Sequence, residues 1–344
     1  MKDTIIKLFN LEPSELQDIE IVSTDFSVHA IITLKVKWQC CPVCGCTTKR
    51  IHDYKKRTLT HAVINDVYTN IIFNQRRYRC TNCDKSFPET NPFAFPNRLV
   101  STYVILRVMK MLRNPRTTFS QVANEVGLSV SSVCRIFDRY AGVTPISIPK
   151  CLCIDEIYAI KYKQKIYACV LVDMQTSQVY DLLPTRRKAD LSSYFSRISQ
   201  EERDKVKYIC MDMFQLYKDV AEVYFPCVKI CIDSFHVIQQ VNNAFINATS
   251  TSENAERRIE NFIAELLLYD VRELTMIARM LRHWKTESIN SFDRVNGQRI
   301  SNGPIESVNS RIKVIKQNGA GYRNFERFKL RVLYSLNDNS SIKI

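Results

Sequence analysis

The chain has 344 residues, 45% of them apolar and 24% charged, which predicts a globular protein of two or three domains; with only 7 glycines and 11 prolines, collagen-like and low-complexity chains are excluded. No apolar run approaches the ~18 residues of a membrane helix, and the first residues carry no secretory signal, so we expect a cytoplasmic protein with no membrane partner. Lys and Arg outnumber Asp and Glu by 49 to 35, which favours a nucleic-acid partner over a merely solubilising charge.

Six of the 13 cysteines lie in two tight groups in the first third of the chain. Each group contains a C-x-x-C pair, Cys41 with Cys44 and Cys80 with Cys83. Four thiolates at this spacing complete the tetrahedral shell of a structural zinc ion. A redox-active pair is the alternative, but two such motifs in one chain favour zinc. The ligand set stays open, because two spare thiols could substitute, Cys40 and Cys46.

The segment between the two cysteine pairs is rich in β-forming residues. Leu59–Val63 and Val67–Phe73 flank Asn65-Asp66 and predict a hairpin. We therefore expect a zinc ribbon over about residues 38–90, within an N-terminal region of residues 1–96. Basic residues crowd this module, and they either contact phosphate or form a solvated face.

Residues 97–141 predict a helix-turn-helix domain. Residues 98–113 and 118–126 have helical apolar spacing, Gly127 supplies a turn, and Val130–Tyr140 predicts the next helix. A plain helical hairpin is the alternative.

The last of these helices carries the candidate DNA-reading residues. Ser129 is its expected N-cap. Ser131, Ser132 and Arg135 face outward, where a recognition helix reads the major groove. Residues 142–149 contain two prolines and predict a linker to the rest of the chain.

From residue 150 the pattern changes to short apolar strands. Three of them run into an aspartate: Cys151–Asp155, Val206–Asp212 and Val228–Asp233. Ligand sites in α/β sheets collect at the carboxyl ends of such strands. The other predicted elements are a hairpin of residues 167–174 and 178–183 and helices at residues 188–198 and 215–225. This order predicts an α/β core over residues 150–344, with its sheet covered on both faces.

We expect a helical insertion over about residues 238–300 to interrupt this core. One apolar stripe runs from Ile259 to Leu267 and another from Leu274 to Leu281, which predicts two antiparallel helices. Trp284 follows them, and its indole either stacks on a DNA base or packs between the helices.

Glu306 begins a further predicted helix, directly after Pro304. Magnesium binds carboxylates from separate elements, such as Asp155, Asp212 and Glu306. Two such ions ~3.5–4 Å apart activate the attacking group and stabilise the leaving oxygen in phosphodiester chemistry. A single aspartate at a strand end is more often a turn residue, but the combination in a basic chain with a zinc ribbon favours a metal site.

Taken in order, these motifs resemble the DDE transposases of the ISL3 family of bacterial insertion sequences, which have a ribonuclease-H-like catalytic core. The cysteine pairs and the helix-turn-helix fit the N-terminal half of that family. The resemblance covers nearly the whole chain, and the order of the motifs is specific. The matching stretches are Ile154 to Glu156, Cys210 to Met213, Asp233 to Val237, Asn302 to Lys313 and Gly321 to Arg331.

The resemblance implies that Asp155, Asp212 and Glu306 form the catalytic triad and bind two Mg²⁺ or Mn²⁺ ions. It implies cleavage of double-stranded DNA at the terminal inverted repeats of the element and attack of the freed 3′-OH on target DNA, by a protein that acts as a homodimer. Asp233 and His236 fall on the D-x-F-H motif of the family and are expected to support the ligands or position DNA. Asp233 as a metal ligand is the alternative.

Glu156 is expected to support the site rather than bind metal, and Asp173 to stabilise a turn. A basic tail lies along DNA or forms an exposed helix face; it comprises Arg311, Lys313, Lys316, Arg323, Arg327, Lys329 and Arg331. Two other functions fit parts of the sequence. A DNA-binding regulator without cleavage has no need of the triad, and a nuclease for RNA–DNA hybrids has no need of the N-terminal sequence reader.

Overall fold

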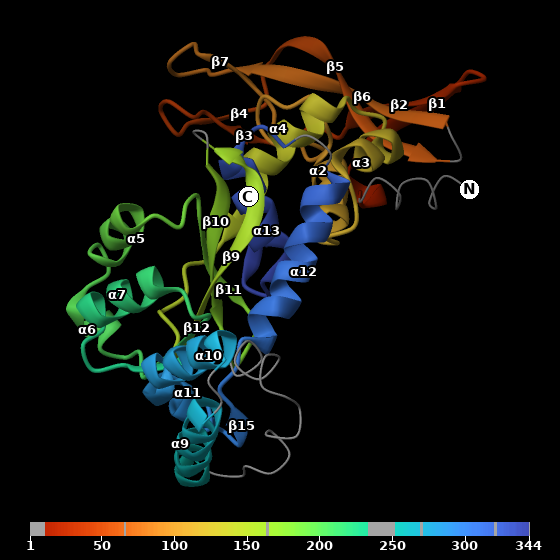
Figure 1. Cartoon of the computed structure of the whole chain (residues 1–344). Coiled ribbons are helices and arrows are strands. Elements are labelled where there is room, and N and C mark those ends of the chain that lie inside the picture. The colour runs from red at the N-terminus through yellow and green to blue at the C-terminus, as the bar shows by residue number, and fades with distance from the viewer. Residues whose placement is uncertain are drawn as a thin grey trace. The chain divides into compact units, whose positions relative to one another are not determined.

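The computed structural model describes residues 11–64, 67–162, 165–232, 252–268, 271–319 and 322–343. The chain divides into two compact units, residues 1–140 with 342–344 and residues 141–341 (Figure 1). In these described ranges, no helix is both long enough and apolar enough to cross a membrane.

The first unit contains a five-stranded sheet. The order of its main strands is β1-β2-β6-β5, and β7 adds to β6. All neighbours are antiparallel except β2 and β6, which are parallel. The strands are β1 (Leu16–Ser23), β2 (Ser27–Leu34), β5 (Ile51–Ile64), β6 (Val67–Arg79) and β7 (Ser86–Pro88).

The predicted hairpin between the cysteine pairs is present but much longer than the sequence pattern indicated. β5 and β6 pair from Ile51 and Tyr78 to Ile64 and Val67. Their extra length is stabilised by β2, because Ile71 and Phe73 of β6 share a buried cluster with Ile32. The hairpin therefore belongs to a larger sheet, and only one end of it carries the cysteines.

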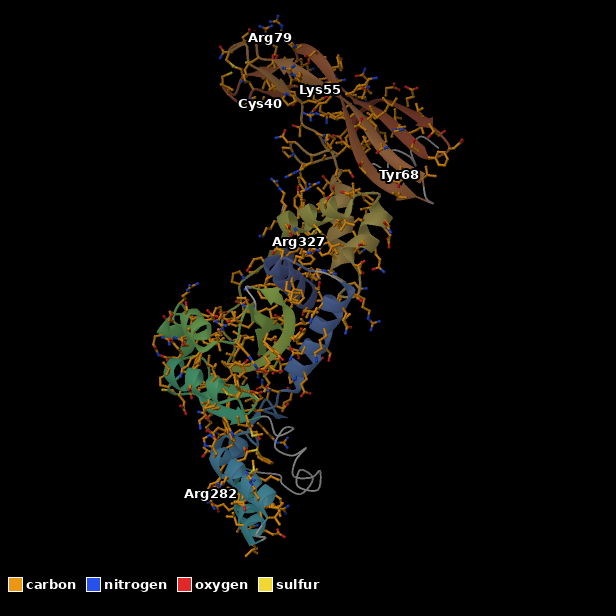
Figure 2. All side chains as sticks on the ribbon, turned by 45° about the horizontal axis from the view of Figure 1, so that its top comes forward. Cys40, Lys55, Tyr68, Arg79, Arg282 and Arg327 are labelled. Carbon is orange, nitrogen blue, oxygen red and sulfur yellow. The ribbon has the colours of Figure 1, made fainter. Side chains whose placement is uncertain are left out.

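Two short pairs of residues, β3 (Gln39–Cys40) and β4 (Thr47–Thr48), frame the first cysteine knuckle. Figure 2 shows Cys40 and Arg79 near one end of this sheet and Tyr68 near the other. The two C-x-x-C pairs meet at the first end, because β5 leaves one knuckle and β6 returns to the other.

Three helices complete the first unit: α2 (Thr102–Leu112), α3 (Phe119–Val126) and α4 (Val130–Tyr140). α3 begins with a capping box between Thr118 and Gln121 and ends at Gly127, whose φ of +66° is the left-handed conformation that favours glycine. The three helices pack against one another. Each contributes buried apolar residues, among them Val108 of α2, Val122 of α3, and Val133 and Phe137 of α4.

The second unit is built on a five-stranded sheet of order β11-β10-β9-β12-β13. β9, β10 and β11 are antiparallel neighbours, whereas β12 and β13 run parallel to β9. The strands are β9 (Cys151–Tyr162), β10 (Lys165–Asp173), β11 (Val179–Leu183), β12 (Tyr208–Met211) and β13 (Lys229–Ile232). Asp173 accepts bonds from the Gln175 backbone (3.0 Å) and the Thr176 hydroxyl (2.8 Å), which fixes the β10–β11 turn.

Helices cover both faces of this sheet, as the continuous apolar strands predicted (Figure 1). Leu152 and Ile154 of β9 face one core, and Cys151 and Cys153 face the other. The first core includes α5 (Lys188–Phe195), α7 (Gln215–Tyr224), α9 (Ser252–Leu268) and α10 (Arg272–His283). The second includes α12 (Gly303–Asn318) and α13 (Phe325–Leu336).

Two predicted segments differ in detail. The segment expected as a linker begins with a strand, β8 (Ala141–Val143), which pairs with β16 (Ser340–Ile342). In the described part of the expected insertion, α9 and α10 contact each other, and α11 (Lys285–Asn290) follows them. α9 and α10 bury apolar residues in the same core as the sheet, so this part packs on the sheet instead of forming a separate core.

Candidate functional site

Asp155 and Asp212 lie side by side because of the register of two parallel strands. Cys153 of β9 is paired with Cys210 of β12, and each aspartate is two residues further along its strand. The prediction that both end their strands is correct for Asp212 but wrong for Asp155. β9 continues to Tyr162, because it pairs with β10 beyond the point where β12 stops.

A third carboxylate joins this pair. Ligand atoms of Asp155, Glu156 and Asp212 all lie within 4.8 Å of one another, and each residue is partly buried. Successive residues of a strand point to opposite faces. Asp155 therefore approaches the side of α12, whereas Glu156 approaches the side of α7, and both reach the end of β12.

Asn309 of α12 ties that helix to Asp155. Its Nδ2 donates to Asp155 Oδ2 at 2.8 Å, and the other carboxylate oxygen accepts from the backbone N–H of Glu156 at 2.7 Å. Asn309 is only 7% exposed, and its Oδ1 is a buried acceptor with no partner within the described residues. A buried oxygen on the amide that holds Asp155 suits a cation or a water that a cation holds.

Glu306 lies in the first turn of α12, three residues before Asn309. Residues three apart share a helix face, so Glu306 and the asparagine that binds Asp155 are on the same side of α12. The Glu306 side chain is exposed, and its carboxylate is not among the three that lie within 4.8 Å of one another. The structure thus brings together Asp155 and Asp212 and places Glu306 one turn from their contact with α12.

Glu156 is engaged from two sides, as a supporting residue would be. Its Oε1 pairs with Arg186, and its Oε2 accepts a hydrogen bond from the Tyr217 hydroxyl at 3.2 Å. Burial raises the pKa of Tyr217, and the nearby Cys169, Glu156 and Asp212 raise it further. The hydroxyl therefore stays protonated and acts as the hydrogen-bond donor to Glu156. Neither Arg186 nor Tyr217 was a sequence candidate, because a short basic run after a strand, Arg186 to Lys188, gives no signal that one of its residues reaches a carboxylate.

Two further candidates of the core, Asp233 and His236, lie outside the described residues. Trp284 is 5% exposed and packs in the core beside α9 and α10. The Lys218 ammonium lies 5.3 Å from the centre of its ring. Of the two interpretations of Trp284, this placement favours packing, because a base could stack on the indole only after the core opened.

The basic tail divides into exposed and engaged residues. Lys313 and Arg323 are exposed, as contacts to DNA require. Arg331 is 1% exposed, which argues against a DNA contact at this residue, and Lys329 pairs with Asp181 at 2.6 Å. Of the basic residues of their helix, α13, Arg331 is buried, whereas Arg327 and Lys329 are half-buried.

The four cysteines of the two C-x-x-C pairs meet at one point. Ligand atoms of Cys41, Cys44, Cys80 and Cys83 lie within 4.8 Å of one another. The Sγ atoms of Cys41 and Cys83 are 3.6 Å apart, and those of Cys44 and Cys80 are 3.4 Å apart. Tetrahedral zinc with Zn–S bonds of ~2.3 Å requires S–S separations of ~3.8 Å. The spacing supports a structural zinc site.

The pKa values of the cluster's thiols shift in different directions. Backbone hydrogen bonds lower the pKa of Cys41 and Cys44, whereas at Cys83 a backbone hydrogen bond from Lys85 is outweighed by burial and the neighbouring cysteines, which raise the pKa. A hydrogen bond from the Cys46 backbone, followed by one from Cys80, lowers the pKa of Cys44 to about 6. The spare thiol of Cys40 donates to the Gly45 carbonyl at 3.2 Å. Within the described residues, the spare cysteines Cys40 and Cys46 lie outside the four-thiol group. The thiols that converge are therefore those of the two C-x-x-C pairs.

α4 presents the residues expected to read DNA. Ser131 and Arg135 are exposed and Ser132 is half-buried. The backbone N–H of Ser132 donates to the Ser129 hydroxyl at 3.2 Å, which is the predicted N-cap, and Arg135 Nη2 donates to the Ser132 hydroxyl at 3.0 Å.

Comparisons with known proteins agree with these two centres. Residues 152–248 and 244–332 match the model of a transposase family, the DDE transposases of the ISL3 type. Residues 38–83 match the model described as the zinc-finger of transposase IS204/IS1001/IS1096/IS1165.

Two more distant similarities carry no functional argument. A protein of Lactococcus lactis subsp. lactis described as an ATP-dependent protease is 53% identical over 36 residues, which are 10% of this chain and 12% of that protein. A chain in the structure of the simian T-cell lymphotropic virus intasome with PP2A regulatory subunit B56 gamma is 12% identical, with a TM-score of 0.18 over 56% of this chain and 72% of that one.

Proposed function

Since the chain belongs to the ISL3 family of DDE transposases, we propose that it binds the terminal inverted repeats of a bacterial insertion sequence and performs metal-dependent DNA strand cleavage and strand transfer there. The observation that carries this proposal is the meeting of Asp155 and Asp212 at the end of β12, with Asn309 joining α12 to the same point. Glu306 is the third member of the proposed triad, because it lies one turn before Asn309 on the same face of α12.

The residues present fit two Mg²⁺ or Mn²⁺ ions. Asp155 in a strand and Asp212 at a strand end supply the hard oxygen ligands that these ions prefer, and α12 carries the third proposed carboxylate, Glu306. Asn309 Oδ1 adds a buried acceptor that has no partner in the part of the chain that the structure describes. When bound, the ions would lower the pKa of the attacking water or 3′-OH and stabilise the leaving oxygen. The protein's own part is to hold Asp155 through two hydrogen bonds, so that little reorganisation is needed when DNA arrives.

The fold of the second unit supports the assignment. Three antiparallel strands followed by two parallel ones, with helices on both faces, is the arrangement expected of a ribonuclease-H-like core. We assign catalysis to residues 150–344 and include the described helices α9 to α11 as the expected insertion.

The first unit supplies the proposed DNA-binding elements. Helices α3 and α4, joined at Gly127, have the form of a helix-turn-helix, and we assign residues 97–141 to it. Exposed Ser131 and Arg135 would contact base edges or phosphates. The zinc ribbon stands in the N-terminal region before it. A homodimer is proposed because two element ends must be joined.

Strand cleavage of a plasmid that carries the gene with its flanking DNA tests the proposal. With Mg²⁺, the wild-type protein should nick this plasmid at two defined ends, and Asp212→Asn should not. Asp173→Asn is a matched control, because this carboxylate lies in the same sheet but only fixes a turn. DNA binding without nicking by the wild type would favour a DNA-binding regulator, and cleavage of RNA–DNA hybrids irrespective of the repeats would favour a hybrid nuclease.

A further inference from the structure

The loop between β11 and α5 places a cation beside the carboxylates. Arg186 forms an ion pair with Glu156, whose carboxylate lies within 4.8 Å of the ligand atoms of Asp155 and Asp212. The Arg186 side chain is 34% exposed. It is therefore both next to the proposed catalytic centre and open to a ligand that arrives from solvent.

Two aromatic rings fix the orientation of this guanidinium. Its carbon lies 4.4 Å from the ring centre of Tyr167 and 5.2 Å from that of Phe214. These rings come from β10 and from the residue that precedes α7. Arginine stacks on aromatic faces, and a stacked guanidinium loses little conformational freedom when it binds a further group.

Glu156 has both oxygens engaged. Arg186 Nη1 donates to Oε1, and the hydroxyl of Tyr217, which is 1% exposed, donates to Oε2. The Glu156 carboxylate is already paired with a cation, whereas the two donors that hold Asp155, Asn309 Nδ2 and the Glu156 backbone N–H, are neutral, so Glu156 is the weaker candidate for a metal ligand. Its position is instead suited to aiming the arginine.

We propose that Arg186 binds a phosphate of the DNA strand that lies on the carboxylates, and that Glu156 is the positioning residue that aims it. This inference rests on the proposed transposase function. Within the described residues, Nη1 is the only guanidinium nitrogen of Arg186 that forms a hydrogen bond. The remaining donors form the planar fork that matches a phosphate. The competing account makes Glu156 a metal ligand and Arg186 only its counter-ion.

The salt dependence of DNA binding tests the phosphate contact. The full-length protein would be titrated at several salt concentrations with a DNA fragment from the flank of the gene. The slope of log K against log [salt] is negative, and loss of one phosphate contact reduces its magnitude by ~0.9. Arg186→Gln should show this decrease, whereas Arg186→Lys should retain the slope but cleave more slowly.

The matched control is Arg203→Gln. Arg203 also lies over an aromatic ring, 5.5 Å from the centre of Tyr224, but its bonds go to the Tyr224 carbonyl and to Gln200, outside the carboxylate group. This variant removes the same charge and a similar stacking contact, so its slope and its cleavage rate should equal those of the wild type.

Binding of Mn²⁺ without DNA separates the two accounts of Glu156. Asp212→Asn should weaken Mn²⁺ binding to the zinc-loaded protein by at least ~10-fold. Glu156→Gln should leave Mn²⁺ affinity within ~2-fold of wild type and still reduce cleavage ~10–100-fold, as expected for a residue that orients another. A large loss of Mn²⁺ affinity in Glu156→Gln would make it a ligand and overturn its positioning role.

The outcomes distinguish this inference from the proposed function. If the wild-type protein does not cleave DNA, the proposed function is wrong. The salt dependence of DNA binding by Arg186→Gln still shows whether Arg186 contacts a phosphate. A wild-type protein that cleaves, with Arg186→Gln equal to it in slope and rate, removes the inference alone. Circular dichroism of each variant identifies any that fails to fold, and in that case Arg186→Lys and its cleavage rate carry the test.

Discussion

The side-chain amide of Asn309 donates a 2.8 Å hydrogen bond to Asp155 across the interface between α12 and β9. The two residues are 154 positions apart in the chain. Asn309 is buried, and the rest of its helix packs Ile305, Val308 and Ile312 against the same sheet face. The bond therefore fixes the rotation of α12 relative to the carboxylates, and with it the direction of Glu306.

Asn309→Leu should impair cleavage without unfolding the protein. The substitution keeps the volume of the side chain but removes a hydrogen bond to a carboxylate, which contributes ~1.5–3 kcal/mol. With Asp155 less well held, we expect cleavage of the plasmid to fall ~10–100-fold. Gln317→Leu, near the exposed end of the same helix, is the control and should cleave normally. Normal cleavage by Asn309→Leu would show that this bond does not orient the site.

Glu306→Gln should abolish cleavage and leave DNA binding within ~2-fold of wild type. The amide has the same shape as the carboxylate but no charge to offer a divalent ion, so we expect a loss of at least ~10³-fold in rate. Glu326→Gln is matched, because Glu326 is also an exposed acid in the first turn of a helix, α13. Cleavage by Glu306→Gln at the wild-type rate would remove Glu306 from the triad and leave the three clustered carboxylates to bind the ions.

Much of the second unit could be predicted from its hydrophobic pattern. The four residues before Asp155 and the three before Asp212 are buried, and burial on both faces of the sheet leaves a continuous apolar signal. The stripe of α12 was predictable for a similar reason, because one helix face packs against the sheet. The convergence of the two aspartates then follows from parallel pairing.

Other parts carry no local signal. β1 was not predicted, because most of its residues are exposed and its pairing with β2 is what holds it. β9 extends past Asp155 because its partner β10 continues, which a single-strand pattern cannot reveal. Arg186 and Tyr217 reach Glu156 from 30 and 61 residues away, and only the fold selects such partners.

Gly127→Ala should destabilise the first unit. A side chain at φ of +66° costs ~1–2 kcal/mol, and the added Cβ would lie 2.7 to 2.9 Å from side-chain atoms of Tyr68 and Val63, so overpacking adds ~1–3 kcal/mol. Thermal unfolding followed by circular dichroism should show a drop of ~5–15 °C for this unit. Gly297→Ala is the control, because it has a φ of +80° but nothing within 4 Å. Equal small effects of both would mean that the turn relaxes and that α3 and α4 do not depend on this contact.

Cys41→Ser combined with Cys83→Ser should eliminate bound zinc and unfold the ribbon. These thiols come from different knuckles and their sulfur atoms are 3.6 Å apart, so the double variant leaves one ligand on each side, and two ligands cannot hold a structural ion. Atomic absorption of the purified protein should give one zinc per chain for wild type and none for the variant, and DNA binding should weaken with it. Cys40→Ser is the matched control, since this exposed thiol lies outside the group of four and should leave the zinc content at one. Loss of zinc in Cys40→Ser, or its retention in the double variant, would show that a spare cysteine is a ligand in place of one of the four.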